Sequence, residues 1–557
     1  MSFQLSDVSK LIPEFLLVVG AIFVLMGDLF GRWRKTEEGY AEQSNEAATM
    51  TIFILAFAFV VTLIQGGFLL HRLGVDFKPV VASAWWDIPS HITNLFANLR
   101  SSGQNAEILG GAFVVDPLTH IGRLIFLGAA LVTVVLTRAV RPTNSPGEFY
   151  ALILFSTLGM ILMTGASELI MIYLGIEMTS IPLYVLAGYF RRDRLSAEAG
   201  IKYYIFGALS SAILLFGMSL LLGMTLMNPQ NSATATTVPT SLRSVALAVE
   251  TTFADPGNAG QAVLILAMIL LIAGMAYKVA VVPFHSWAPD VYQGAPTAMT
   301  AFISTASKTA GFFLLYRVLL TAFAAPETSG TAELIGANGT GISFGGWTSA
   351  LAIIAALTML VGNLAALPQT NAKRMLAYSS IAQAGFLLLG LVGMGRDSGV
   401  SLVYYLVVYT LTNLGAFGVL ALVEHKVGGT EFSNLNGLGR RSPGLTLLMT
   451  IAILSLAGIP PLAGFFAKFY VFIAAWQEGA KWLVIFAVAN TVISLYYYLR
   501  FLKAMYFAEP ESREPITAPF GARTVMTITM LLVLALGVVP GIVYGAFEQV
   551  AVSLASR

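Results

Sequence analysis

Apolar runs of about 20 residues recur along this chain and restrict its fold more than any other feature. A helix of that length crosses the hydrocarbon core of a bilayer, whereas a membrane barrel would show short strands of alternating polarity. Of the 557 residues, 57% are hydrophobic and only 11% are charged, which is far from the composition of a soluble globular domain. We therefore expect an all-α integral membrane protein held in a lipid bilayer.

The length and spacing of the apolar runs predict fourteen membrane spans, and the first is too long for a cleaved signal. They are expected near residues 12–31, 50–70, 119–137, 149–166, 168–189, 199–226, 262–283, 295–322, 347–368, 374–395, 400–424, 445–472, 482–506 and 523–547. Two long polar inserts, at 71–111 and 228–260, contain no site motif, and we expect both to be solvent loops.

Charge and cysteine content exclude several classes of function. The formal net charge is +2, which gives no reason to expect a nucleic-acid partner. The chain contains no cysteine, so it cannot itself hold a disulfide, a thiolate zinc site or a cysteine-ligated iron–sulfur cluster.

Lysine and arginine are concentrated in the odd-numbered loops between the predicted spans. These residues are Arg32, Arg34, Lys35, Arg138, Arg141, Arg191, Arg192, Arg194, Lys373, Arg374, Lys426, Arg440, Arg441, Arg500, Lys503 and Arg513. Because cytoplasmic loops carry the excess of positive charge, the odd-numbered loops are predicted to be cytoplasmic and both termini external.

Two of the spans are interrupted by proline and carry a lysine in mid-span. Lys278 precedes Pro283 by five residues, whereas Lys468 follows Pro461 by seven. Because the lysines lie on different sides of their prolines, we do not expect the two breaks to superimpose. A lysine in hydrocarbon costs a few kcal/mol, and a proline frees a backbone group that lipid cannot satisfy. Both features predict a wet, protein-lined interior, and a pair of interrupted spans is typical of internally repeated transporters.

Glu177 and Lys308 add two more charges near the middle of predicted spans. A carboxylate can hold a proton, and a lysine removed from water can release one near neutral pH, so these residues, with Lys278 and Lys468, have the chemistry of a proton relay. The alternative is a set of buried ion pairs that fix helix register. We favour the relay because intramembrane charge is usually functional and the lysines outnumber acidic partners.

Other polar residues support weaker hypotheses. Lys202 follows Glu198 by one helical turn, so it forms either an interfacial ion pair or part of a relay. His285 lies two residues after Pro283, where it either passes protons towards Asp290 or bonds to freed backbone carbonyls. A last group lies near span ends, and solvated or capping roles are expected for its members, Glu14, Asp28, Asp116, His120 and Glu168.

Several motifs of the chain resemble those of a known family. They are Leu174-Gly-Ile-Glu177-Met-Thr-Ser-Ile-Pro-Leu-Tyr, Ala199-Gly-Ile-Lys202-Tyr-Tyr, Lys278-Val-Ala-Val-Val-Pro-Phe-His285-Ser-Trp-Ala-Pro-Asp290-Val-Tyr-Gln-Gly-Ala-Pro296, Ser304-Thr-Ala-Ser-Lys308, Asn371-Ala-Lys373-Arg374-Met-Leu-Ala-Tyr-Ser-Ser380-Ile, Leu456-Ala-Gly-Ile-Pro460 and Lys468-Phe-Tyr470. With these motifs, the chain is similar to the antiporter-like membrane subunits of bacterial respiratory complex I, the NADH:quinone oxidoreductase. The resemblance extends from about the fourth predicted span to the thirteenth.

The resemblance implies fourteen transmembrane helices with two inverted five-helix repeats that contain discontinuous helices. The implied division is 1–148 for helices 1 to 3, 149–346 for the first repeat, 347–508 for the second repeat and 509–557 for the last helix. The implied function is proton translocation, driven by quinone reduction elsewhere in the complex.

The resemblance also implies roles for four residues. Glu177 would be the carboxylate of the first half-channel and Lys278 its partner, Lys308 would connect the halves, and Lys468 would be the exit-side lysine. Family members often have a histidine in the tenth span where this chain has Gln383, which orients water but carries no proton, so the relay is in question there.

No cofactor is expected in this chain. The resemblance places NADH, FMN, the iron–sulfur clusters and quinone on other subunits. It implies that the partners are other membrane-arm subunits and that the location is the bacterial inner (plasma) membrane. The alternative is a subunit of a cation/proton antiporter or of a related membrane-bound hydrogenase or dehydrogenase.

Overall fold

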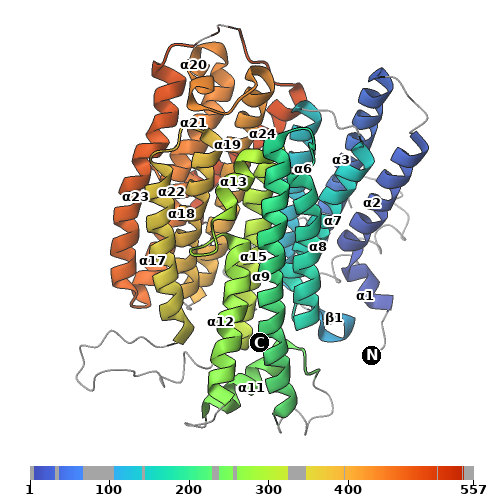
Figure 1. Cartoon of the computed structure of the whole chain (residues 1–557), viewed down its shortest axis with the longest axis vertical. Helices are drawn as coiled ribbons and strands as arrows, with labels where there is room; N and C mark the ends of the chain where they lie inside the picture. Colours follow the sequence, from blue (N-terminus) through green and yellow to red (C-terminus); the bar gives the residue numbers. More distant parts are fainter. Residues whose placement is uncertain are drawn as a thin grey trace, which may run out of the picture.

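The computed structural model is a bundle of long, nearly parallel helices (Figure 1). It describes residues 5–31, 37–66, 106–140, 145–228, 238–254, 260–323, 346–393, 396–510, 512, 514–541 and 544. Within these ranges, thirteen helices are long and apolar enough to cross a membrane, which confirms the predicted all-α membrane fold. Of the basic loop residues used to predict orientation, Arg32, Arg34, Lys35, Arg141 and Arg513 lie outside the described residues.

The N-terminal part of the chain forms three long helices and one hairpin. Its elements are α1 (Leu5–Lys10), α2 (Ile12–Gly31), α3 (Glu37–Gln65), β1 (Ala106–Ile108), η1 (Leu109–Gly111), β2 (Phe113–Val115) and α6 (Pro117–Val140). The two strands pair antiparallel, with Ala106 opposite Val115.

The middle of the chain contains the first interrupted helix. Its elements are α7 (Pro146–Gly165), α8 (Leu169–Ala187), α9 (Arg194–Met227), α11 (Leu242–Ala254), α12 (Gly260–Val279), α13 (Trp287–Gly294), α14 (Thr297–Phe302), the π-helical segment η2 (Ile303–Ser307) and α15 (Lys308–Ala322).

The last part of the chain contains the second interrupted helix. Its elements are α17 (Gly346–Ala366), α18 (Ala372–Val392), α19 (Arg396–Val427), η3 (Phe432–Leu435), α20 (Leu438–Arg441), α21 (Pro443–Ala457), α22 (Ala463–Gln477), α23 (Lys481–Leu502), the π-helical segment η4 (Lys503–Phe507) and α24 (Phe520–Val538).

Three details differ from the sequence-based expectations. The twelfth predicted span consists of two 15-residue helices, α21 and α22, because its prolines end the first of them. The second span begins at Glu37 instead of near residue 50. The predicted solvent loops are partly wrong: residues 106–111 form β1 and η1, and α11 folds within 228–260 and packs on α15 and α9, while residues 71–105 lie outside the described residues.

Burial places three spans at the centre of the bundle. The whole apolar window of Thr297–Ala322 is buried inside the protein, and 89% of the corresponding windows in α18 and α19 is buried. In α3 and α9 only 33% is buried, and their outer faces carry large apolar side chains such as Phe53 and Leu209. The charged residues of the central spans are therefore shielded from lipid by an outer layer of helices.

The first interrupted helix ends in a compact backbone motif. The Val281 amide donates to the Ala276 carbonyl (3.1 Å), and the Ala280 amide donates to the Tyr277 carbonyl (3.0 Å). This pair of bonds is a Schellman motif, in which one residue adopts the left-handed region, and Ala280 does so with φ 56°. The Val282–Pro283 peptide bond that follows is cis.

The second interrupted helix ends in the same motif. The Ile459 amide donates to the Leu454 carbonyl (3.1 Å), and Gly458, with φ 83°, donates to the Ser455 carbonyl (2.9 Å). The cis bond, before Pro461, falls three residues after the left-handed residue, as in the first break. The two helices therefore end in equivalent backbone motifs. The positions of Lys278 and Lys468 relative to their prolines had predicted that the two breaks would not superimpose, and this prediction was wrong for the backbone.

The two breaks are reached from opposite ends of the bundle. Figure 1 shows α12 rising from the lower end beside α11, whereas α21 descends from the upper end beside α20. A π-helical segment lies in the second helix after each break: η2 lies between α14 and α15, after α13, and η4 extends α23, after α22. These matched elements are what two repeats of opposite orientation would produce.

Two buried ion pairs join the outer helices to the core. Arg123 lies 2.7 Å from Glu14, and Arg317 lies 2.9 Å from Asp116, with all four side chains less than 8% exposed. Asp116 also caps α6, because its Oδ1 accepts from the Thr119 amide (2.9 Å). The solvated roles predicted for Glu14 and Asp116 are therefore wrong, whereas capping by Asp116 is confirmed.

Candidate functional site

Lys278 lies in the last turn of α12, where the negative end of the helix dipole favours a cation. Its side chain is buried, and Nζ donates to the Ser180 hydroxyl of α8 (2.8 Å). Glu177 lies one turn before Ser180 on the same helix, with Oε1 buried and without a hydrogen-bond partner. The structure thus places the predicted carboxylate and lysine on facing helices, although no ion pair joins these two described side chains.

Gly311 connects the surroundings of Lys278 and Lys308. A Cβ at Gly311 would lie 2.9 Å from Cγ1 of Val279 and 3.2 Å from Cγ of Lys278, so a glycine allows α15 to approach α12 closely. Gly311 follows Lys308 by three residues. The two lysines therefore lie on either side of one helix contact, without a direct hydrogen bond between them among the described residues.

Lys308 follows the π-helical segment η2 and reaches across to α18. Its Nζ donates to the Ser380 hydroxyl (2.5 Å) and to the Ser380 carbonyl (2.9 Å). The Tyr409 hydroxyl of α19 has one hydrogen and two acceptors within reach, the Ser380 hydroxyl (3.0 Å) and the Ser304 carbonyl (2.9 Å). Ser380 is therefore a junction between a buried ammonium group and a buried phenol.

Gln383 lies one turn after Ser380 and is held by two tyrosines. Its Oε1 accepts a hydrogen bond from Tyr405, and its Nε2 donates to the Tyr498 hydroxyl (3.1 Å) and to the Leu456 carbonyl (3.1 Å). The amide is thus fixed in one orientation, with phenolic hydroxyl groups at both ends. Phenols can exchange protons, which the amide cannot.

Lys468 lies on α22, after the second break, but its ammonium group reaches back to the end of α21. Nζ donates to the carbonyls of Leu456 (3.0 Å) and Ala457 (3.2 Å) and lies 5.0 Å from the centre of the Phe386 ring. Leu456 precedes Gly458 by two residues, as Lys278 precedes the left-handed residue of the first break. Both lysines therefore place a positive charge at the C-terminal end of a half-helix, although one precedes its break in the sequence and the other follows it.

A cavity of about 10 Å³ separates the Lys308 group from the Lys468 group. Its lining includes Tyr409, Gln383, Tyr405 and Lys468. This volume is at the lower limit for one water molecule, and hydroxyl, amide and ammonium groups offer it the polar partners that it needs. A single water in this cavity would connect the two groups.

None of the three central lysines forms an ion pair with a described carboxylate. Lys278, Lys308 and Lys468 are at most 6% exposed, and their bonds go to hydroxyl and carbonyl groups. Fixed ion pairs, the structural alternative considered for them, are therefore absent at these described side chains. An unpaired ammonium in a low-dielectric interior is a group whose charge can change.

Lys202 differs from the central lysines because it belongs to a cluster of four charges. Its Nζ lies 2.6 Å from both Glu198 and Asp290, and Asp290 accepts in addition from Arg374 (2.6 Å). The predicted pair with Glu198 is confirmed, and the side chain of Lys202 is 36% exposed. The cluster ties α9, α13 and α18 together.

His285 lies in the segment between α12 and α13, as predicted from its place after the proline. Its Nδ1 is buried and has no hydrogen-bond partner among the described residues. Asp290 is already bonded to two cations, and no described hydrogen bond joins it to His285. The structure therefore does not place His285 and Asp290 in the direct contact that the predicted proton transfer between them needs.

Sequence reasoning missed the hydroxyl groups of the site. Ser180, Ser380 and Tyr409 bear no charge and lie in apolar spans, so composition and periodicity give them no weight. The signals available were Ser180 and the serine pair at 379–380, which lie inside recognised motifs. Among the described residues, no group of three or more histidine or acidic side chains is placed to hold a metal ion.

The sequence of the chain matches a known protein family. The family described as NADH:quinone oxidoreductase/Mrp antiporter, TM matches residues 166–342 and 339–494. A relative named NADH-quinone oxidoreductase subunit N 2, from Herpetosiphon aurantiacus, is 68% identical over 557 residues and is matched over 100% of both chains.

Solved structures share the fold. A chain of respiratory complex I from Thermus thermophilus with bound aureothin is 31% identical, with a TM-score of 0.69 over 96% of this chain and 98% of that chain. A chain of the Mrp complex from Dietzia sp. DQ12-45-1b has a TM-score of 0.70 over 98% of each chain, but at 18% identity the likeness concerns the fold alone.

Proposed function

Because the chain belongs to the subunit N family of NADH-quinone oxidoreductases, the antiporter-like membrane-arm subunits of complex I, we propose that its buried lysine series carries protons across the membrane. The observation that carries the proposal is that Lys278, Lys308 and Lys468 are buried without carboxylate partners and are bonded to hydroxyl and carbonyl groups. Such ammonium groups gain and lose protons more readily than paired ones.

In the proposed route, Glu177 and Lys278 form the first half-channel and Lys308 connects the halves. From Lys308 the proton passes through the Ser380 and Tyr409 hydroxyls and a water in the small cavity to Lys468, the exit-side lysine. Gln383 does not interrupt this route, because the Tyr409 hydroxyl and the cavity bypass its amide.

We further propose the division into 1–148, a first repeat at 149–346, a second repeat at 347–508 and a last helix at 509–557. The matched breaks and π-helical segments support it, as do the two matched stretches of the family. We give Lys202 and His285 secondary roles in proton transfer. Lys202 belongs to a cluster of four charges, and His285 lies in the first break.

The protein must be driven by partners. Moving one charge against 100 mV costs about 2.3 kcal/mol, and the exchange of protons among carboxylate, ammonium and hydroxyl groups does not release that energy. We therefore propose that quinone reduction on other subunits supplies the energy, with NADH, FMN, iron–sulfur clusters and quinone bound there. The partners are then other membrane-arm subunits and the lipid bilayer, without nucleic acid.

We propose the inner (plasma) membrane of a bacterium as the location, with odd-numbered loops cytoplasmic and both termini external. The described loops that carry basic residues meet at the end of the bundle that bears α20, at the top of Figure 1. There, Arg440 pairs with Glu509 and Lys426 with Glu514. This end is called the α20 end below, and it is cytoplasmic by the positive-inside rule.

The proposal is tested by NADH-driven proton uptake into inverted membrane vesicles. Glu177→Gln and Lys278→Ala are expected to lower proton uptake at least about tenfold, because each removes a group that exchanges protons. The matched control is Lys426→Ala, which removes a half-exposed lysine whose partner is also exposed. Native proton uptake by both site variants in an assembled complex would refute the route.

Copurification separates this function from the antiporter alternative. A complex with flavin, iron–sulfur clusters and NADH:quinone activity supports the proposal, whereas sodium/proton exchange without redox subunits supports a cation/proton antiporter. The relative at 68% identity favours the first outcome, since the Mrp complex shares the fold alone.

A further inference from the structure

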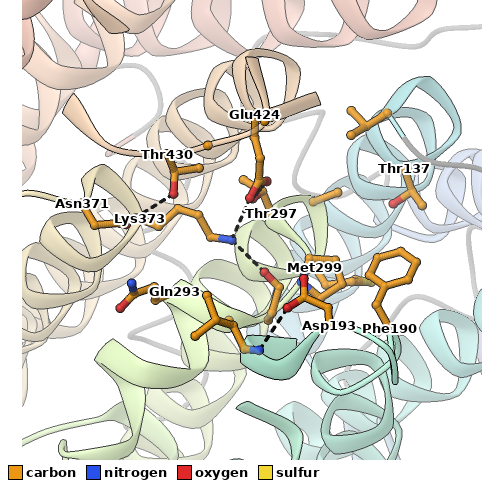
Figure 2. Close-up of a pocket in the computed structure, with 18 of the residues that line it drawn as sticks. Thr137, Phe190, Asp193, Gln293, Thr297, Met299, Asn371, Lys373, Glu424 and Thr430 are labelled. Carbon is orange, nitrogen blue, oxygen red and sulfur yellow. Dashed lines mark hydrogen bonds and ion pairs between the residues drawn. The ribbon is translucent and has the colours of Figure 1, made fainter. Parts of the chain in front are cut away.

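A pocket of about 330 Å³ opens at the α20 end, between the two halves of the chain (Figure 2). Its lining comes from the ends of α6, α13 and α19 and from the starts of α7, α9, α14 and α18. The pocket has room for several water molecules, and it is not lined by any of the four main residues of the proposed route.

The polar groups of the pocket converge on one carboxylate. Figure 2 shows Lys373, Glu424 and Thr297 pointing towards one another. The ammonium of Lys373 lies 3.6 Å from Oε1 of Glu424, and the Thr297 hydroxyl donates to Oε2 of the same carboxylate. The side chain of Glu424 is 34% exposed, whereas Lys373 and Thr297 are buried. Glu424 therefore faces both the solvent and the protein interior.

A row of hydroxyl groups leads inward from this carboxylate. Thr297, Thr300 and Ser304 follow one another at intervals of three and four residues, so they share one side of the helix. All three are buried, and Thr300 donates to the Ala295 carbonyl (3.3 Å), which also accepts from Lys373 (2.8 Å).

The row ends at the Lys308 junction. The Ser304 carbonyl accepts from the Tyr409 hydroxyl (2.9 Å), which in turn bonds to the Ser380 hydroxyl that holds Lys308. At about 1.5 Å per residue, the distance from Thr297 to Lys308 along the helix is about 16 Å. Polar groups thus extend from the pocket to Lys308 without passing Glu177 or Lys278.

We propose that this pocket is a second mouth of the proton path, through which protons from the α20 side reach Lys308 directly. Glu424 takes up the proton at the mouth, Lys373 positions its carboxylate, and Thr297, Thr300 and Ser304 guide water to the Ser380 junction. The inference rests on the proposed function and extends it, because it gives Lys308, the connecting lysine, a separate source of protons from the α20 side.

The absence of cysteine from the whole chain allows a direct test of access. Single-cysteine variants Thr297→Cys and Thr300→Cys are exposed to a membrane-impermeant maleimide in inverted and in right-side-out vesicles. Labelling of this chain is expected from the α20 side alone, and more slowly at Thr300. Two controls are matched: Ala416→Cys on α19 is as buried as Thr300 but lies outside the pocket lining and the threonine row, so it should stay unlabelled, and Arg243→Cys, which is exposed on α11, should react only from the other side.

A second measurement tests whether protons use the mouth. In the proposal Lys278 and Lys308 are each loaded from their own mouth in every pumping cycle, so closing either mouth stops the cycle. Glu424→Gln is therefore expected to lower NADH-driven proton uptake at least tenfold, because the amide keeps a polar contact with Thr297 but cannot carry a proton. The control is Glu431→Gln, an exposed carboxylate of the same pocket whose Oε1 accepts from Asn371 (3.0 Å), for which less than a twofold change is expected.

The outcomes separate the two proposals. If Lys308→Ala abolishes proton uptake but Glu424→Gln does not, or if Thr297→Cys is unlabelled from the α20 side, the second mouth is refuted and the main route stands. If Lys308→Ala pumps normally in an assembled complex, the proposed function fails and the mouth fails with it. Labelling at both threonines together with loss of uptake in Glu424→Gln supports the mouth.

Discussion

Ser380→Ala removes the hydroxyl at which the first and second halves of the proposed path meet. That hydroxyl accepts from Lys308 (2.5 Å) and from Tyr409 (3.0 Å), and it lies 3.5 Å from the Tyr292 hydroxyl. The substitution changes no charge and removes one oxygen atom. It therefore tests the junction without removing either titratable neighbour.

The size of the effect follows from the bonds that remain. Without the hydroxyl, Lys308 keeps the Ser380 carbonyl (2.9 Å), and Tyr409 keeps the Ser304 carbonyl (2.9 Å). A hydrogen bond to a charged group contributes about 1.5–3 kcal/mol, and 1.4 kcal/mol corresponds to about tenfold in an equilibrium constant. We therefore expect the equilibrium constant for binding of the Lys308 ammonium at this junction to fall about tenfold, with a similar fall in the pumping rate.

The assay is NADH-driven proton uptake into inverted vesicles, measured beside NADH oxidation in the same preparation. Ser219→Ala is the control, because that hydroxyl is exposed and bonds only to the Phe216 carbonyl of its own helix (2.8 Å). Tyr409→Phe alone and combined with Ser380→Ala completes a double-mutant cycle, in which a non-additive loss measures the coupling between them. Native uptake by Ser380→Ala in an assembled complex would refute the Lys308–Ser380–Tyr409 link.

Three further predictions concern stability. Arg317→Met leaves the buried carboxylate of Asp116 without its cation, so it should lower the free energy of unfolding by about 3–5 kcal/mol, visible as a fall in the thermal midpoint of the detergent-solubilised complex; an unchanged midpoint would contradict it. Gly458→Ala should destabilise the chain by about 1 kcal/mol, because φ is 83° there and the new Cβ would lie 3.2 Å from Cδ of Lys468. Ala280→Gly, at the equivalent left-handed residue, should change the same midpoint in the opposite direction, and equal signs would show that the two breaks are not equivalent.

The recognised motifs and the hydrophobic pattern were enough for the membrane class, the positions of most spans and the burial of the lysines. Span positions follow from local properties, since every backbone group of a helix in lipid is satisfied within its own segment. The prolines were also enough to predict the break in the second interrupted helix. The same reasoning failed in 228–260, where α11 forms by packing on α15 and α9 in a region that its polar composition marks as a loop.

The partners of Lys278 and Lys308 could not be predicted, because both come from a distant part of the chain. Ser380 is 72 residues from Lys308, and Ser180 is 98 residues from Lys278. A neutral hydroxyl in an apolar span carries no signal until a cation is packed against it. The same holds for Glu424, whose place at the end of α19 gives no hint of Lys373 or of the pocket.

Hydropathy and proline act within one segment, so they are enough to predict that the chain crosses a membrane many times, that two of its spans are broken and that lysines lie inside it. What each lysine touches depends on how the helices pack. Lys278 and Lys468 lie on opposite sides of their breaks in the sequence, yet both serve the end of a half-helix, because Lys468 folds back to the Leu456 carbonyl. This equivalence cannot be predicted from the order of residues along the chain, because it depends on how far the Lys468 side chain reaches once α21 and α22 have packed together.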